Sequence, residues 1–170
     1  MNTNQGVPAA LAPERVAILI DVANLYGVAK HQHAGKKVDL LRLREHCAQG
    51  REVVSTTAYF CTPPKVDISV VTEMLEREGF VVKHKEARFQ ASDSKMTQDW
   101  TAQISFDAAS AARYADTIVL VSGKSGYEDL MTSLKRGGIR VEVCSFETAI
   151  SERLRAEADA FLPITTEMLR

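Results

Sequence analysis

The chain has 170 residues and a formal net charge of -1, and its composition is ordinary for a soluble globular protein. This length is sufficient for one domain with its own core, and the near-zero charge excludes a global field that attracts nucleic acid or membranes. There is no signal peptide and no apolar run long enough to span a bilayer, so we expect a cytoplasmic protein without a membrane partner. The cysteines Cys47, Cys61 and Cys144 are far apart, which indicates free thiols in a reducing compartment.

Predicted strands and helices alternate along the chain. Residues 1–14 are polar and aperiodic and predict a flexible N-terminal tail before a single domain of residues 15–170. Strands are predicted at 15–21, 52–61, 80–89 (an edge strand or hairpin), 118–121, 139–146 and 160–164, and helices at 22–33, 39–49, 66–78, 95–114, 126–137 and 151–158. This order predicts an α/β fold, a three-layer sandwich in which helices flank a mostly parallel central sheet.

Two of these helices carry apolar stripes that predict their buried faces. In the helix at 66–78, the residues expected to face the core are Val70, Val71, Met74 and Leu75. In the helix at 95–114, they are Trp100, Ile104, Ala108 and Ala111. Both helices are therefore expected to cover the sheet.

The segment 117–134 contains the junction around which the domain is organised. A strand that is apolar on both faces stops at Ser122-Gly123, and a helix follows. Open α/β sheets bind their ligands in the crevice beyond such strand ends, so Ser122, Lys124 and Ser125 are candidate ligand contacts. Gly123-Lys124-Ser125 resembles the end of a P-loop, but the glycine required five residues earlier is replaced by Ile118.

Asp21 and Asn24 follow the first predicted strand. As the last residue of that strand, Asp21 is placed to project into the crevice, where the Asn24 amide can brace it or touch a ligand. The alternative is that Asp21 is only the N-cap of the next helix, a position that aspartate often takes.

A further acid, Asp107, lies within the predicted helix 95–114. Its apolar neighbours suggest partial burial toward the crevice, whereas the simpler alternative is a solvated helix face. Asp99 and Asp107 share one side of this helix but lie about 12 Å apart along its axis, too far to hold one metal directly. Several cations lie in segments that could surround the crevice and bind phosphate, with an ordinary charged surface as the alternative: Lys83, Lys85, Arg88, Lys95 and Lys124.

These segments together resemble the NYN-domain family of PIN-like ribonucleases over residues 16–162. The resemblance is carried in order by AILIDVANLYG, DWTAQISFDAA, TIVLVSGKSGYEDLMTSLKRGGIRVEVCSF and SERLRAEADAFLPI. It implies parallel strands flanked by helices and RNA hydrolysis by acids at the carboxyl edge of the sheet. In that chemistry, several carboxylates hold Mg²⁺ or Mn²⁺, which activates water and neutralises the scissile phosphate.

The family's site residues are only partly preserved in this chain. Residues that match its pattern are Asp21, Asn24, Asp107, Tyr127 and Asp159. Three positions where the family has acids are occupied by Thr101, Lys124 and Gly126. Asp21 and Asp107 would then be the residual catalytic and metal-binding acids, a weak hard-metal site unless Asp99 or Glu128 is recruited. The Lys124 ammonium would repel a divalent ion and could itself neutralise Asp21 and Asp107.

The sequence therefore predicts a pseudonuclease that binds RNA or another phosphate ligand with little or no hydrolysis. The expected ligand contacts are Asn24, Thr101, Ser122, Lys124, Ser125 and Asp159. One alternative is an active Mg²⁺- or Mn²⁺-dependent ribonuclease with a rearranged acidic site. Another is a non-catalytic interaction module with a protein partner or a second copy of the chain.

Overall fold

The structure is a computed structural model that describes residues 12–90, 95–97 and 99–170. Six strands form one sheet in the order β3-β2-β1-β6-β7-β8, and every neighbouring pair is parallel. The strands are β1 (Arg15–Asp21), β2 (Glu52–Thr62), β3 (Val81–Glu86), β6 (Thr117–Val121), β7 (Arg140–Ser145) and β8 (Ala160–Pro163). A separate antiparallel pair consists of β4 (Arg88–Gln90) and β5 (Lys95–Thr97). The expected parallel sheet is confirmed.

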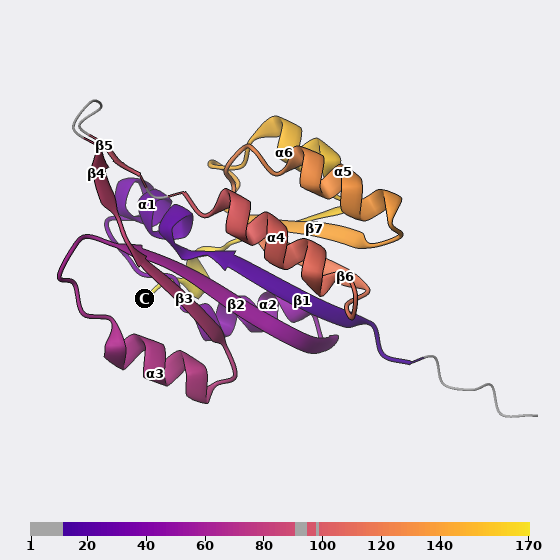
Figure 1. Ribbon diagram of the computed structural model, residues 1–170, viewed down its shortest axis with the longest axis horizontal. Helices are drawn as coiled ribbons and strands as arrows, with labels where there is room; N and C mark the ends of the chain where they lie inside the picture. Colours follow the sequence, from indigo (N-terminus) through magenta and orange to yellow (C-terminus); the bar gives the residue numbers. More distant parts are fainter. Residues whose placement is uncertain (1–11, 91–94, 98) are drawn as a thin grey trace, which may run out of the picture.

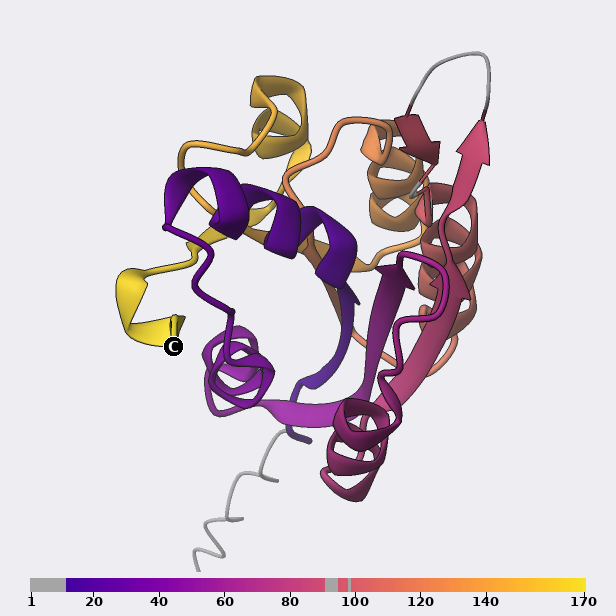
Figure 2. The same cartoon turned by 90° about the vertical axis from the view of Figure 1, so that its left-hand side faces the viewer.

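Helices cover both faces of this sheet (Figures 1 and 2). One face carries α1 (Val22–Gln32), α2 (Leu40–Ala48), α3 (Ser69–Arg77) and the short 3-10 helix η1 (Thr166–Met168), and the other carries α4 (Thr101–Ala111), α5 (Glu128–Arg136) and α6 (Glu152–Glu157). Alternate residues of β1 enter the two cores, because side chains of a strand point to opposite faces. The three-layer sandwich is therefore confirmed. None of the described helices combines the length and apolarity needed to cross a membrane.

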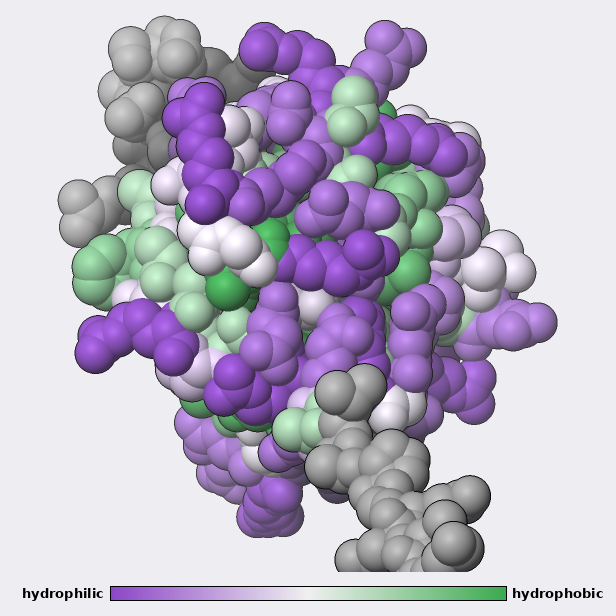
Figure 3. Space-filling view, turned by 90° about the vertical axis from the view of Figure 1, so that its right-hand side faces the viewer, coloured by the Kyte–Doolittle hydropathy of each residue, from purple (hydrophilic) through white to green (hydrophobic). Residues whose placement is uncertain are grey.

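The strand register sets the position of the crevice. Ile20 of β1 lies beside Val121 of β6, so Asp21 and Ser122 follow at the same carboxyl edge. This edge faces the viewer in Figure 2. The opposite face, shown in Figure 3, is dominated by hydrophilic residues. The two neighbouring strand ends therefore place their polar residues together on one side of the molecule.

The predicted helix at 95–114 was too long. Its first part is the strand β5, and α4 begins only at Thr101. The Asp99 carboxylate accepts a hydrogen bond of 2.8 Å from the Thr101 N–H, which favours a helix start just after Asp99. Asp99 consequently precedes the helix and does not share its face with Asp107.

The predicted burial of α3 was also largely wrong. Leu75 is buried, whereas Val70 is 78% exposed and Val71 and Met74 are nearly 40% exposed. The helix lies beside the edge strand β3, so only one line of its side chains reaches the sheet. Its apolar stripe is therefore wider than the surface it packs against.

The predicted flexible tail falls mostly on residues outside the described ranges. Glu14, which the structure does describe, accepts a hydrogen bond of 3.1 Å from Arg51 and another from the Thr117 hydroxyl. The domain thus makes side-chain contacts immediately before β1.

Candidate functional site at the carboxyl edge of the sheet

Asp21 is both a helix cap and a wall of the crevice. Its carboxylate accepts hydrogen bonds from the Asn24 N–H at 3.2 Å and from the Ser122 hydroxyl at 3.3 Å. Only 3% of the residue is exposed, yet it lines a cavity of about 300 Å³ together with Asn24 and Lys124. The two interpretations of Asp21 from the sequence are therefore compatible.

Burial determines the protonation behaviour of Asp21. Loss of hydration raises the pKa of its carboxyl group, and the Asn24 N–H and the Lys124 charge only partly oppose this shift. A buried carboxyl group that is costly to ionise lowers the stability of the folded protein, so a purely structural role does not explain it. Such perturbed acids are concentrated at functional sites.

The turn after β6 is held closely to its neighbours. The Gly123 N–H donates to the Asn24 side-chain oxygen at 3.1 Å, and the Lys124 N–H donates to the Ser122 hydroxyl at 3.3 Å. A Cβ atom at Gly123 would collide with the carbonyl oxygen of Ala149. Glycine is therefore required here, and the turn fixes the origin of the Lys124 side chain.

The Lys124 ammonium lies at the crevice, but its direct partners differ from those expected. It is 2.8 Å from the Asp99 carboxylate and 3.1 Å from the Thr101 hydroxyl. The hydrogen bond from Lys124 is the main reason that the pKa of Asp99 is strongly lowered. Lys124 acts on Asp21 through its charge alone, and Asp107, which Lys124 was also expected to neutralise, is instead paired with Lys83.

Tyr127 adds a buried donor beside this site. The residue has no exposed surface, and its hydroxyl has no hydrogen-bond partner among the described residues. Burial, followed by the nearby negative charge of Asp21, raises the pKa of Tyr127. Its hydroxyl therefore stays protonated, and because it is fully buried it lies beside Asp21 and Thr101 rather than at the ligand surface. The sequence indicated an aromatic residue here but not this buried hydroxyl.

Asp107 belongs to a different cluster. Its carboxylate accepts hydrogen bonds of 2.6 Å from both Tyr59 and Lys83 and of 2.9 Å from Gln103. Burial opposes ionisation, but these donors outweigh it and lower the pKa of Asp107. In the sheet register Asp21, Tyr59 and Lys83 form a row across β1, β2 and β3, which separates the ends of the row by about 10 Å.

Asp159 and Ser125 also have locations that the sequence did not resolve. The Asp159 carboxylate accepts a hydrogen bond of 2.8 Å from the N–H of Val141, near the start of β7. It therefore lies at the opposite edge of the sheet, away from Asp21. Ser125 is exposed in the turn before α5, on the same side as Lys124.

The residues at this edge do not fit a divalent metal ion. Within the described ranges, no group of three or more histidine, cysteine, aspartate or glutamate residues is arranged to hold one. Asp107 is engaged elsewhere, and the Lys124 ammonium is bonded to Asp99. Magnesium needs several oxygen ligands around it, so this set of side chains is unsuited to it.

The other predicted cations are also accounted for only in part. Lys83 is paired with Asp107, while the Lys85 ammonium donates to the carbonyl of Asp99 and lies 4.2 Å from the centre of the Trp100 ring. The side chains of Arg88 and Lys95 lie outside the described part of the structure.

Comparisons with known proteins agree with this architecture. The NYN domain family matches residues 15–165. A crystal structure of a protein of unknown function from Vibrio parahaemolyticus is 28% identical, with a TM-score of 0.81, over 93% of this chain and 97% of that chain. A comparison with curated proteins found no significant match. The chain belongs to the NYN domain family, within the PIN-like nuclease superfamily.

Proposed function

We propose that this protein is a pseudonuclease that binds single-stranded RNA at the carboxyl edge of its sheet with little or no hydrolysis. The NYN family often binds RNA and is generally metal-dependent. The observation that carries the proposal is the Lys124 ammonium, 2.8 Å from Asp99, at a site with too few acids for a metal. A fixed ammonium attracts a phosphate and repels a divalent cation.

The geometry supports a simple binding role for each residue. The Lys124–Asp99 pair is partly exposed, so a phosphate oxygen can compete with Asp99 for the ammonium. The Thr101 hydroxyl lies beside the Lys124 ammonium, and Ser125 is exposed on the same turn. Ser122 is buried, and its hydroxyl supports the turn by accepting from the Lys124 N–H. Asn24 supports this turn through Gly123.

The compartment is part of the same proposal. Cys47, Cys61 and Cys144 are all free thiols, and Cys47 and Cys144 are buried. Free thiols of this kind persist in a reducing environment, which supports a cytoplasmic RNA ligand.

Binding of single-stranded RNA by the native chain and a Lys124→Asp variant tests the proposal. Fluorescence anisotropy in the presence of a chelator should show roughly tenfold weaker binding by the variant and a salt dependence reduced by about one phosphate contact. Arg113→Asp is the matched control, because Arg113 is exposed in the segment between α4 and the start of β6. Equal binding by native and Lys124→Asp proteins would contradict the proposed site.

A restoration experiment separates this proposal from an active ribonuclease. The double variant Thr101→Asp, Lys124→Asp would add two carboxylates near Asp21 and Asp99. Gly126 is left unchanged because its φ of 109° makes a side chain there unfavourable. Cleavage of RNA with Mn²⁺ only by the restored chain supports a lost site. Cleavage by the native chain that Asp21→Asn abolishes would instead establish an active enzyme.

A further inference from the structure

A second hollow lies beside the Lys124 site, on the other side of α1. It has a volume of about 500 Å³, within the range of roughly 300–1,000 Å³ that is typical of ligand pockets. Its walls come from α1, the end of β2 and the segment leading into α3. We call it the α1–α3 groove, and the apolar residues that define it are Tyr26, Phe60, Val66, Ile68 and Val71.

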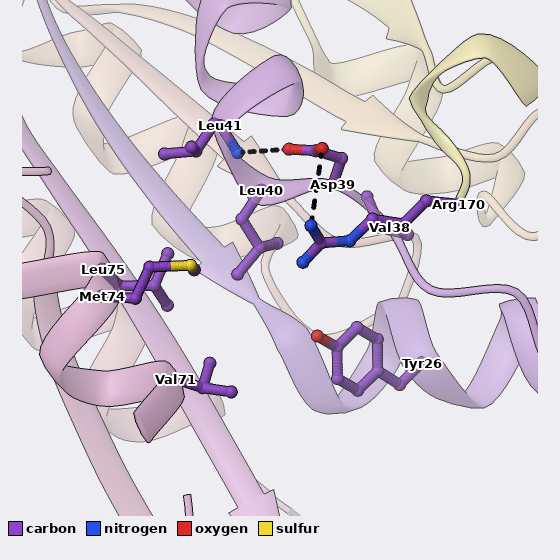
Figure 4. Close-up of a pocket in the computed structure, with 9 residues that line it drawn as sticks. All are labelled: Tyr26, Val38, Asp39, Leu40, Leu41, Val71, Met74, Leu75 and Arg170. Atoms are coloured by element: carbon purple, nitrogen blue, oxygen red, sulfur yellow. Dashed lines mark hydrogen bonds and ion pairs between the residues drawn. The ribbon is translucent and has the colours of Figure 1, made fainter. Parts of the chain in front are cut away.

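The groove presents apolar and aromatic surface to solvent. Val66 is 45% exposed and Val71 is 39% exposed, although both have side chains that normally favour burial. The Tyr26 and Phe60 rings pack edge to face, with 6.5 Å between their centres. Figure 4 shows Tyr26 of α1 and Val71 of α3 on opposite sides of a smaller adjoining cavity, which is also lined by Asp39 and Arg170. These two residues form an ion pair of 3.9 Å.

Gly27 connects this groove with the Lys124 site. Ala23 and Gly27 of α1 line both the 300 Å³ cavity beside Lys124 and the α1–α3 groove. A Cβ atom added at Gly27 would have no heavy atom within 4 Å, so the space above the helix is open. A glycine inside a helix costs about 1 kcal/mol relative to alanine, and no packing contact explains its presence here. An extended ligand can therefore cross α1 at Gly27.

The charges around the groove favour an anionic ligand. Lys30 and Lys37 line it and are exposed, whereas the lysine ion pairs in the described part involve Lys83, Lys124 and Lys135. Neither Lys30 nor Lys37 is thus neutralised by a carboxylate of the described residues. Asp67 also lines the groove, and its carboxylate accepts a hydrogen bond of 2.8 Å from the Ser69 N–H. Two unpaired cations therefore outnumber this one acid.

These observations identify the chemistry of the occupant. We infer that an RNA strand bound at Lys124 crosses α1 over Gly27 and places an unpaired base in the α1–α3 groove, with a neighbouring phosphate at Lys30 and Lys37. The aromatic face of the base matches the apolar wall of the groove. The negative charge of the RNA backbone matches Lys30 and Lys37 at its rim. The inference rests on the proposed function. It selects one of two directions for the strand, toward the apolar groove and its two lysines and away from the β3 side, where Lys83 is paired with Asp107.

The direction can be tested with an oligouridine of about eight nucleotides, within the usual range for single-strand sites. Gly27→Leu fills the crossing point without adding charge and places a good helix former on α1. We expect roughly tenfold weaker binding, the order of effect for losing one stacked base. Ala109→Leu is the matched control, because Ala109 is exposed on α4, across the sheet from α1. Circular dichroism and thermal melting verify that both variants are folded.

Photo-crosslinking of an oligouridine that contains 4-thiouridine provides a second measurement on the native chain. Mass spectrometry should locate crosslinks at Tyr26 or in the segment from Val66 to Val71. Crosslinks confined to β3 and α4, or unchanged binding by Gly27→Leu, overturn the inference while the Lys124 site stands. If the native chain binds no RNA at all, both the inference and the proposed function fail.

Discussion

Two clusters on the same face of the sheet contain the same three residue types but differ in how completely they are bonded. In one, Asp107 accepts hydrogen bonds of 2.6 Å from both Tyr59 and Lys83. In the other, Asp21 lies near Lys124 and Tyr127, but the lysine is bonded to Asp99 and the tyrosine hydroxyl has no partner in the described structure. The first cluster is complete by itself, whereas in the second the lysine belongs to a partly exposed pair in which a ligand can replace Asp99.

The two acids show the same contrast in their protonation. Burial raises the pKa of Asp21, whereas the donors around Asp107 overcome its burial and lower its pKa. An ionised aspartate therefore stabilises the folded state at Asp107 and destabilises it at Asp21. An aspartate, a lysine and a tyrosine near one another do not by themselves indicate a site, since the deciding property is whether their bonds are already satisfied.

Replacement of the acid that is bonded to the lysine of each cluster should give the largest difference between the two clusters. Asp107→Ala leaves Tyr59 and Lys83 without their acceptor, and we expect the free energy of unfolding to fall by about 3 kcal/mol. Asp99→Ala removes a carboxylate that is 55% exposed, and the expected loss is about 1 kcal/mol or less. Urea denaturation of both variants measures the difference. Equal losses would show that the Asp107 cluster contributes no more to stability than an ordinary surface pair.

Removal of the tyrosine hydroxyls should change the free energy of unfolding by an intermediate amount, with opposite signs in the two clusters. Tyr59→Phe deletes a donor to Asp107 and should lower the free energy of unfolding by about 1–2 kcal/mol. Tyr127→Phe deletes a buried hydroxyl that has no hydrogen-bond partner among the described residues, so stability should rise by up to about 1 kcal/mol without a direct effect on RNA binding. Thermal melting and anisotropy on the same preparations test this. Loss of stability in Tyr127→Phe would reveal that its hydroxyl already has a partner.

The pH dependence of stability should show the smallest effect. The pKa of Asp21 is higher in the folded state than its usual value of 3.8. Its contribution to the free energy of unfolding is therefore fully present below pH 3.8 and is lost as the pH rises through the folded-state pKa. Asp21→Asn, which can still cap α1, should therefore gain in melting temperature relative to the native chain as the pH rises.

Asp107→Asn is the natural counterpart for this pH series. The lowered pKa of Asp107 gives a contribution that is present above 3.8 and is lost as the pH falls through the folded-state pKa. Relative to the native chain, this variant should lose melting temperature as the pH rises. If the melting temperatures of the two variants, relative to the native chain, changed in the same direction with pH, the two acids would not differ in environment.

The elements that sequence patterns predicted well are those governed by local rules. The apolar run before Asp21 and the turn at Ser122-Gly123 located two neighbouring strand ends, and the register of β1 with β6 brings them together. The helix predicted from residue 39 is also present as α2, and the Asp39 carboxylate accepts hydrogen bonds from two N–H groups of its first turn. In each case the signal lies within a few residues of the strand end or helix start that it marks.

The misplaced residues depend on contacts that are distant in sequence. Asp107 bonds to Tyr59, which is 48 positions away, and Lys83, which is 24 positions away, so its spacing along α4 carried no information about its cluster. The exposure of Val70 and Val71 depends on how far α3 extends past the sheet, which helical periodicity does not encode. Residue type predicted a crevice, but the choice of partners within it required the tertiary structure.

The tight fit at Gly123 has a consequence for the speed of recognition. Its carbonyl accepts a hydrogen bond of 3.0 Å from the Ser151 N–H, while its own N–H is fixed by Asn24. Little backbone entropy then remains to be lost when a phosphate arrives, because the loop is preorganised. The Lys124 ammonium exchanges Asp99 for a phosphate oxygen by side-chain motion, which takes place on the nanosecond scale. Association should therefore be governed by diffusion and charge, without a slow conformational step.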